Sequence, residues 1–284
     1  MEVAELAATR TRVARVLPPI AMVLSAVADV RATPSETSEL VDQLHHKEWV
    51  RVLGQGTGWA YVQAEDHYFG WVRDCELETL PGTPHGRVVG PALARVHDEP
   101  DARSRVVGHL AAGTALPTHQ SPGVDGPWLG VHAWLGEEQQ RKVAGPRVYA
   151  GFVSLDDVVS TDDFPRRAPT AADLLATAEA FLGVPYLWGG TTALGIDCSG
   201  FVQQVYRLNG IRLDRDAHQQ AMEGRSVDVP AAGDLIFFGG ERVTHVGLAA
   251  TERTFINAPQ AGAKVRYDEL PAGRNVLGIR RYLP

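Results

Sequence analysis

An internal repeat limits what the N-terminal half of the chain can fold into. The stretch ADVRATPSETSELVDQL begins at Ala28 and the stretch ARVHDEPDARSRVVGHL begins at Ala94, and the two align without a gap. Short runs of alternating apolar and polar residues are separated by Gly, Pro and Asp turns, which is typical of β-strands. The repeat therefore predicts two small all-β units, over residues 1–80 and 81–160.

The two copies also end alike, with Gly70-Trp71-Val72 in the first and Gly151-Phe152-Val153 in the second. An opening V-R-x-x-P-S and a closing G-W-V resemble bacterial SH3-like barrels, small modules that accompany cell-wall enzymes. The resemblance implies two such barrels in this chain. The polar segment EEQQRKVAGP, residues 137–146, is interpreted as a loop inserted into the second copy.

A change of composition separates this half from the rest. Residues 161–170, TDDFPRRAPT, are rich in proline and charge and are interpreted as a linker. Beyond it, 171–182 is predicted to be a helix that Thr170 caps and Gly183 ends. A second helix and a run of strands indicate an α+β domain over 171–284. The predicted strands cover residues 234–238, 243–250, 254–258 and 276–282.

One of the two cysteines, Cys198, stands where a reactive thiol is expected. It follows a glycine-rich loop and begins an amphipathic helix, and a first-turn cysteine faces unpaired N–H groups and the positive helix end. We therefore expect its pKa to lie below the ordinary value of ~8.5. Cys75 has neither feature and is interpreted as structural. On the helix we expect an inward face of Phe201, Val202, Val205 and Tyr206 and an outward face of Gln203, Gln204 and Arg207.

A thiol nucleophile needs a base, and the base needs a group to orient it. His245 lies on an apolar strand, where alternation places Val243 and Gly247 on the same face, and Gly247 would leave room for a substrate. Asn257 lies on the next predicted strand, and its carbonyl can accept a hydrogen bond from one imidazole nitrogen, leaving the other free for the sulfur. The order cysteine, histidine, polar residue favours a catalytic role over a structural histidine.

Five segments within the last part of the chain resemble, in order, the NlpC-type cysteine peptidases of the papain-like superfamily. Together with the two barrels, they resemble the bacterial γ-D-glutamyl-L-diamino acid endopeptidases that recycle cell-wall peptides. The resemblance implies a papain-like α+β domain that cuts murein peptide between D-Glu and the diamino acid. The segments are PYLWGG at 185–190, DCSGF at 197–201, GDLIFF at 233–238, THVGL at 244–248 and FINA at 255–258.

The resemblance also implies catalytic roles. Cys198 would be the nucleophile, His245 the base and Asn257 the orienting residue, at a position where the family more often has histidine. Tyr186 resembles the tyrosine that lines the oxyanion site. The resemblance implies no metal and no organic cofactor.

Substrate-binding residues carry over in the same way. Asp197 and Ser199 resemble the residues that bind the substrate backbone. Asp216 resembles the acidic residue that takes the free amino group of the first L-Ala, although Ala217 replaces the serine that often follows it. The alternative for Asp216 is a helix N-cap, and both roles can hold at once.

From the first barrel, Tyr68 and Glu39 could wall the pocket; the alternative is that both are ordinary surface side chains. Two other functions stay open: an exported hydrolase of intact cell wall, and a binding protein that has lost activity. The preferred diamino acid and the oligomeric state are also open.

Composition limits the partners. With 27 Lys and Arg against 34 Asp and Glu the net charge is −7, which argues against nucleic acid. No apolar run reaches the ~18 residues of a membrane span. Residues 19–30, PIAMVLSAVADV, resemble a short signal peptide, but the flanking prolines and charges favour a core strand. We therefore expect a cytoplasmic protein, with the cell envelope or secretion as the alternative.

Overall fold

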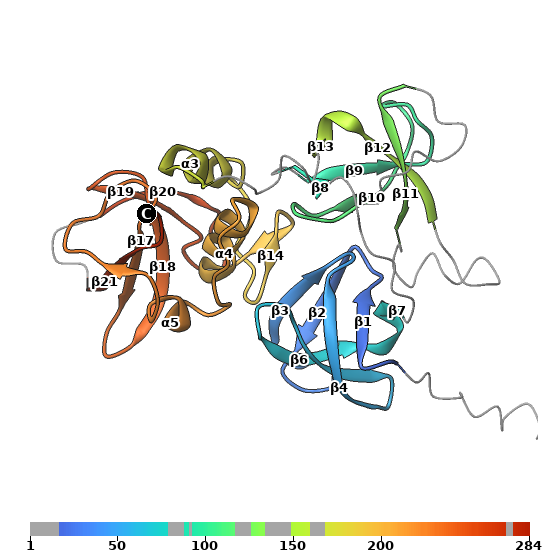
Figure 1. Ribbon diagram of the computed structural model, residues 1–284, viewed down its shortest axis with the longest axis horizontal. Helices are drawn as coiled ribbons and strands as arrows, with labels where there is room; N and C mark the ends of the chain where they lie inside the picture. The colour runs from blue at the N-terminus through green and yellow to red at the C-terminus, as the bar shows by residue number, and fades with distance from the viewer. Residues whose placement is uncertain are drawn as a thin grey trace, which may run out of the picture.

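The computed structural model describes residues 17–78, 88–90, 93–116, 126–133, 149–159, 168–270 and 275–284. They form two β units and an α+β domain (Figure 1). The inserted loop expected at 137–146 and most of the expected linker, 161–167, lie outside the described residues.

The first unit is a seven-stranded antiparallel sheet in the order β3-β2-β6-β5-β4-β1-β7. A core of small apolar side chains, including Ala28, Val62 and Val72, lies inside it. The strands are β1 (Ile20–Val23), β2 (Val27–Arg31), β3 (Leu40–His45), β4 (Trp49–Gly56), β5 (Trp59–Gln63), β6 (Phe69–Arg73) and β7 (Leu77–Glu78), with a 3-10 turn at Asp74–Glu76 before β7.

The single strand expected over 19–30 is wrong, because this run forms two strands. β1 pairs with β4 and β7, whereas β2 pairs with β3 and β6. The chain must change partners between them, so the ladder breaks, and Leu24 donates its N–H to the carbonyl of Glu76 at 2.7 Å instead. Most apolar residues of the two strands are buried in the core, as expected, but Ile20 is 58% exposed.

The second unit contains a four-stranded sheet, β10-β9-β12-β11, and a two-stranded sheet, β13-β8. The sequence repeat is also a repeat in the structure. A Cβ added to Gly70 would lie 2.3 Å from Val30, and one added to Gly151 would lie 2.4 Å from Val96. In both copies the glycine lets two strands approach at the same place. The strands are β8 (Val88–Val89), β9 (Ala94–His97), β10 (Val106–Leu110), β11 (Trp128–Ala133), β12 (Tyr149–Ser154) and β13 (Val158–Val159), with a 3-10 turn at Leu155–Asp157.

The C-terminal domain packs helices against a six-stranded antiparallel sheet in the order β16-β21-β17-β18-β19-β20. Its strands are β16 (Arg225–Ser226), β17 (Leu235–Gly239), β18 (Val243–Ala249), β19 (Thr254–Asn257), β20 (Arg266–Glu269) and β21 (Val276–Arg281). The helices are α3 (Ala171–Glu179), α4 (Cys198–Leu208) and α5 (Ala217–Gln220), and a hairpin of β14 (Thr191–Thr192) and β15 (Gly195–Ile196) precedes α4. The predicted strands are all present; β20 and the two-residue strands were not expected.

Helix α3 begins as the sequence predicts, with a capping box between Thr170 and Asp173. It ends at Glu179 rather than at residue 182. The N–H groups of Phe181 and Leu182 bond to carbonyls three residues back, which tightens the last turn out of α-helical geometry. Gly183, at φ +85°, then turns the chain.

The inward face of α4 matches the sequence, since Phe201, Val202, Val205 and Tyr206 are all fully buried. The outward face does not: Gln203 and Gln204 are also buried. The first barrel covers this side of the helix, and Gln203 donates from Nε2 to Asp66 at 2.9 Å. The periodicity of one domain cannot show that a second domain covers its polar face.

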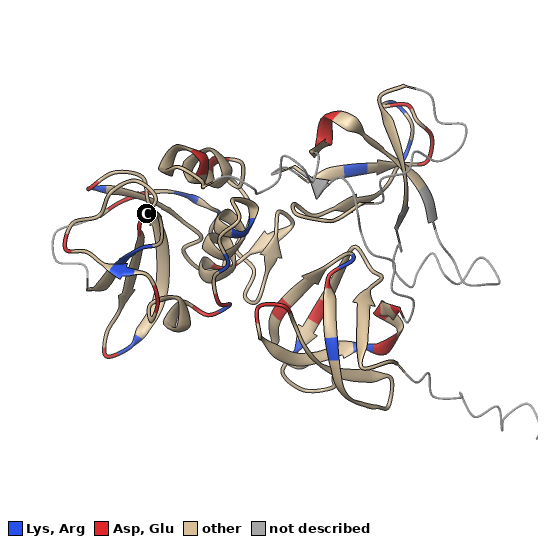
Figure 2. Cartoon of the chain, in the orientation of Figure 1, with Lys and Arg blue, Asp and Glu red and all other residues tan. Residues whose placement is uncertain are grey.

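The first barrel and the C-terminal domain share further polar contacts. Thr191 donates from Oγ1 to the carbonyl of Gln43 at 3.1 Å, and Arg207 pairs with Glu48 at 2.5 Å. Strand β3 and the hairpin that precedes α4 therefore lie together, beside α4 (Figure 1). Figure 2 shows acidic and basic residues interspersed on all three parts of the molecule.

Candidate active site

Cys198 is the first residue of α4, as the sequence predicts, and Asp197 is its N-cap. The Asp197 carboxylate accepts from the N–H of Gly200 at 2.7 Å and from that of Gly189 at 2.9 Å. A Cβ on Gly200 would lie 2.4 Å from the carbonyl oxygen of Gly190. A larger residue would not fit at Gly200, because the preceding loop packs against the first turn of the helix.

The expected low pKa of Cys198 is wrong for this structure. Burial raises the pKa of the Cys198 thiol to about 11, and the neighbouring Asp197 carboxylate raises it further. The backbone N–H groups of Val246 and Ser199 and the charge of Arg215 lower it, but they do not offset burial. The helix N-terminus alone therefore does not make a thiolate here, and a base must take the proton.

His245 and Asn257 lie on neighbouring strands, β18 and β19, as expected. Their side chains are joined by a hydrogen bond of 2.9 Å between His245 Nε2 and Asn257 Oδ1. Asn257 is fully buried, and its Nδ2 donates to Asp268 at 3.0 Å. Because the amide nitrogen is held by a carboxylate, the amide oxygen must face the imidazole. Asp268, on the unexpected strand β20, is thus a residue that sequence reasoning missed.

Cys198 and the strand that carries His245 are close in the fold. The N–H of Val246, the residue after His245, interacts with the Cys198 sulfur. Since Asn257 occupies Nε2 of the imidazole, proton exchange with the thiol would use Nδ1. The backbone next to the imidazole thus lies at the thiol, and Asn257 orients the ring through its hydrogen bond.

Gly247 does not have the expected role. A Cβ at this position would lie 2.5 Å from the ring of Phe255 and 3.3 Å from the Cβ of Asn257. The missing side chain therefore makes room for the orienting asparagine and its neighbour, not for a substrate.

Tyr186 is half-buried, and its backbone forms a bridge with that of Ile196, just before Cys198. Burial raises the pKa of its phenol, and the nearby Cys198 and Asp197 raise it further. The hydroxyl therefore stays protonated and can act as a hydrogen-bond donor beside the sulfur.

Asp216 and Tyr68 are brought together from two domains. The Tyr68 hydroxyl lies 3.4 Å from Asp216 Oδ2, and burial, followed by the Asp216 charge, raises the pKa of Tyr68 to about 12. Asp216 also caps α5, and its N–H donates to Gln219 Oε1 at 2.9 Å. Neither side chain is a plain surface group, and for Asp216 the cap and the inter-domain contact hold at once.

Glu39 also reaches the C-terminal domain. Its Oε1 accepts from Trp188 Nε1 at 2.8 Å. Next to this contact, Gly189, at φ +75°, packs against the backbone of Leu40, where a Cβ would lie 2.5 Å from the carbonyl oxygen. The barrel thus closes against the loop that leads to Cys198. Cys75, by contrast, is exposed beside β6 and is not a core residue.

Arg215 is the residue that sequence reasoning missed most completely. It is 1% exposed, and its guanidinium donates to Asp42 of the barrel at 2.7 Å, to Asp197 at 2.6 Å and to Ser199 Oγ at 3.0 Å. Burial alone would lower the pKa of Arg215, but the two carboxylates raise it, so the group stays charged. In the sequence Arg215 lies between Asp214 and Asp216, and neither neighbour indicates that its partner in the barrel is Asp42.

Within the part of the chain that the structure describes, no group of three or more His, Cys, Asp and Glu residues is placed to hold a metal ion. No helix there has the length and apolar character to cross a membrane.

Two family models match this chain. Residues 183–275 match the NlpC/P60 family, and residues 30–77 match the bacterial dipeptidyl-peptidase SH3 domain. A crystal structure of an NlpC/P60 family protein from Bacillus cereus superposes with a TM-score of 0.75 at 24% identity, covering 93% of this chain and 100% of that one. The fold of these three parts is therefore shared.

Curated relatives include two γ-D-glutamyl-L-lysine dipeptidyl-peptidases. The one from Bacillus cereus is 38% identical over 134 residues and the one from Bacillus subtilis is 38% identical over 120 residues. The aligned part spans 40% of the length of each of these relatives and 44% and 40% of this chain. Dipeptidyl-peptidase 6 of Lysinibacillus sphaericus is 28% identical over 88% of this chain and 91% of its own length.

Proposed function

Residues 183–275 belong to the NlpC/P60 family of cysteine peptidases, and from this premise we propose that the chain hydrolyses the bond between γ-D-Glu and an L-diamino acid in murein peptides. We further propose that it requires a free N-terminal L-Ala and that it serves peptidoglycan recycling. The names of the curated relatives, which act on γ-D-glutamyl-L-lysine or are dipeptidyl-peptidases, support this proposal.

The proposed reaction passes through an acyl-enzyme. Cys198 attacks the γ-carbonyl of D-Glu while His245 takes the thiol proton and passes it to the leaving amine. Asn257 holds the imidazole, and water then releases the acyl group. The Cys198 N–H and the Tyr186 hydroxyl would stabilise the oxyanion, by roughly 3 kcal/mol for each donor.

The observation that carries the substrate proposal is the pairing of Asp216 with Tyr68. Three carboxylates, those of Asp42, Asp197 and Asp216, surround one buried guanidinium, that of Arg215. The guanidinium bonds to Asp42 and Asp197 rather than to Asp216, whose carboxylate caps α5 and has a long contact with the Tyr68 hydroxyl. A half-buried carboxylate in this state favours a cationic partner such as a free amino terminus.

The barrel supports selection by size as well. Glu39 and Tyr68 both reach from the barrel to the C-terminal domain, one to Trp188 and one to Asp216. In intact wall the L-Ala nitrogen is amidated to the glycan, so it has no charge for Asp216 and carries a bulky group. We propose on this ground that free peptides are the substrate, which fits a cytoplasmic location.

The experiment compares L-Ala-γ-D-Glu-L-Lys with its N-acetyl form, with products identified by mass spectrometry. We expect the wild type to cut only the free peptide at an appreciable rate. The variant Asp216→Asn should lose about ten- to a hundredfold in kcat/KM on the free peptide, because a charge-assisted contact contributes roughly 1.5–3 kcal/mol.

The matched control is Asp214→Asn, which makes the same change two residues away and should keep the preference. If the wild type cut the acetylated peptide or intact sacculi as fast as the free peptide, the recycling role would be wrong. Exported cell-wall hydrolysis would then replace it. If the wild type cut none of the murein peptides, the alternative function, a binding protein without catalytic activity, would replace the proposal.

A further inference from the structure

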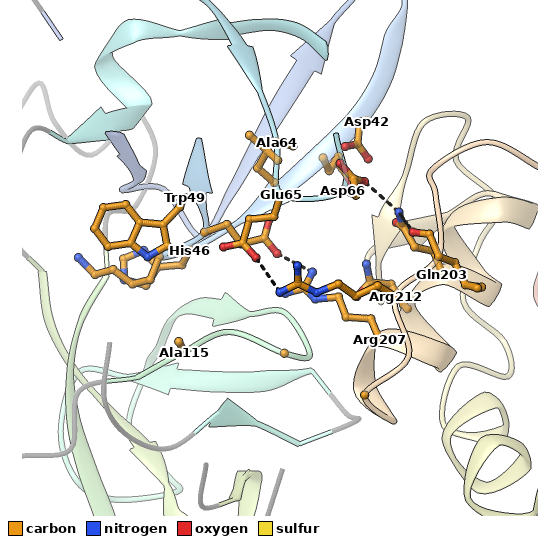
Figure 3. A pocket seen from close by; sticks show the side chains of 18 residues that line it. Asp42, His46, Trp49, Ala64, Glu65, Asp66, Ala115, Gln203, Arg207 and Arg212 are labelled. Atoms are coloured by element: carbon orange, nitrogen blue, oxygen red, sulfur yellow. Dashed lines mark hydrogen bonds and ion pairs between the residues drawn. The ribbon is translucent and has the colours of Figure 1, made fainter. Parts of the chain in front are cut away.

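A cavity lies outside the candidate active site, where the three parts of the molecule meet (Figure 3). It has a volume of about 660 Å³, within the range of small-molecule sites. Its walls come from β3, β4 and the β5–β6 loop of the first barrel, from residues 113 and 115 of the second unit, and from the C-terminal half of α4 with the segment 210–213 after it. None of Cys198, His245 and Asn257 lines it.

One buried polar group in this wall lacks a partner among the described residues. Gln204 is 2% exposed and lines the cavity, and its Oε1 accepts no hydrogen bond there. Buried acceptors in proteins are rarely left unpaired. An occupant with an N–H group would supply the missing donor once the Gln204 amide turns toward the cavity.

Most charges in the wall are already paired with the protein. Asp42 bonds to Arg215, Glu48 pairs with Arg207 at 2.5 Å, and Lys47 pairs with Glu78 at 2.6 Å. These groups therefore have little left to offer a ligand.

Two other polar groups in the wall also have little to offer a charged ligand. Asp66 accepts from both Gln203 and the N–H of Tyr68. Burial lowers the pKa of His46 to about 4, so this imidazole is neutral near pH 7.

Two wall charges are only loosely engaged. Glu65 from the barrel and Arg212 from the C-terminal domain approach within 3.7 Å, and their side chains are 51% and 83% exposed. Figure 3 shows these two side chains meeting from the two domains, with the ring of Trp49 farther along the cavity wall. The wall thus offers one carboxylate, one amide oxygen, one guanidinium and one aromatic face.

This set of groups matches a small zwitterion. We propose that the cavity binds an amino acid or short peptide whose ammonium group lies against Glu65 and Gln204 Oε1 and whose carboxylate lies against Arg212. A guanidinium is the preferred protein partner of a carboxylate, and an ammonium group can serve a carboxylate and an amide oxygen together. The cavity is large enough for a dipeptide, with a side chain against Trp49.

The test measures binding of the dipeptide L-Ala-L-Ala to the full chain by calorimetry. Two further probes each lack one charge: the N-acetyl form and the C-terminal amide. We expect saturable binding of the zwitterion and roughly tenfold weaker binding of each derivative, because each loses one charge-assisted contact.

Variants locate the site. Arg212→Gln and Glu65→Gln change exposed side chains, so both variants should fold. Each should weaken binding of the zwitterion about tenfold. Gln204→Met removes the unpaired acceptor at similar volume and should weaken it too. Asp98→Asn, in the second unit and outside the cavity lining, is the matched control and should leave this binding unchanged; Asp216→Asn reports any binding of the dipeptide at the proposed active site.

Two outcomes would overturn the proposal. One is the absence of saturable binding up to about 10 mM, beyond which affinity is negligible. The other is binding that Asp216→Asn abolishes and that Arg212→Gln and Glu65→Gln leave intact, because the dipeptide would then occupy only the active site.

Discussion

Removing the Asp42 carboxylate should weaken both the docking of the first barrel and catalysis. The Asp42 and Arg215 side chains are 4% and 1% exposed and lie 2.7 Å apart. Breaking a buried pair from one side costs about 3–5 kcal/mol because the remaining charge stays buried. Since Arg215 keeps Asp197, we expect the lower end for Asp42→Ala, about 3 kcal/mol.

A loss of this size has a measurable thermal signature. For folded units of this size each kcal/mol shifts Tm by about 2–4 °C, so Asp42→Ala should melt about 6–12 °C lower. Catalysis should fall with it, because Arg215 also holds Asp197, the cap of the helix that begins at Cys198. We expect about a tenfold loss in kcat/KM, which corresponds to ~1.4 kcal/mol of transition-state stabilisation. Asp42→Asn, which keeps the acceptor oxygen, should lose less of both.

The matched control is Asp98→Ala in the second unit. Asp98 pairs with Arg105 at 3.1 Å, but the side chains are 34% and 75% exposed, so the pair contributes at most about 1 kcal/mol. Differential scanning calorimetry and steady-state kinetics on both variants decide the question. If Asp42→Ala melted within about 2 °C of Asp98→Ala and kept the wild-type kcat/KM, the buried pair would not couple the barrel to the site.

Three further outcomes are expected. Cys198→Ala should abolish turnover of murein peptides while far-UV circular dichroism shows an unchanged fold; a substantial residual rate would contradict the thiol mechanism. Asn257→Ala should be strongly impaired and Asn257→His partly active in the same assay, because the residue sets the imidazole orientation rather than forming bonds; an unchanged Asn257→Ala rate would assign that role to another residue. Burial raises the pKa of Cys198 from 9.0 to about 11, so the unfolded chain releases this proton first and the wild type should lose stability as pH rises from 9 to 11. Urea titrations at pH 9 and pH 11 measure the free energy of unfolding, and Cys198→Ala should lack this part of its decrease. An equal decrease in both proteins would show that burial does not perturb the thiol.

Local signals in the sequence predicted much of the candidate site. Asp197, Cys198 and Gly200 are neighbours along the chain, so the cap, the nucleophile and the space before the loop could be recognised together. His245 and Asn257 lie on consecutive antiparallel strands, and such strands usually pair. The repeat likewise predicted both β units, because each copy carries its own alternation and turns.

Some expectations failed where one part of the chain covers another. Gln203 and Gln204 satisfy every rule for an exposed helix face, yet both are buried, and Gln203 bonds to Asp66 of the first barrel. Gly247 lies on the predicted face, but only the position of Phe255 on the next strand shows what the missing side chain accommodates. In each case the deciding neighbour belongs to a different element.

The sequence by itself determined the strands, the capped helices and the order of thiol, imidazole and amide, because these depend on the polarity and backbone preferences of neighbouring residues. Only the tertiary structure decided the environment of the thiol and the link to the barrel. Asp42 and Arg215 are separated by 173 positions and meet only when two domains dock. Burial then raises the pKa of Cys198 above the value that its helix position predicts, because desolvation depends on everything packed around the sulfur.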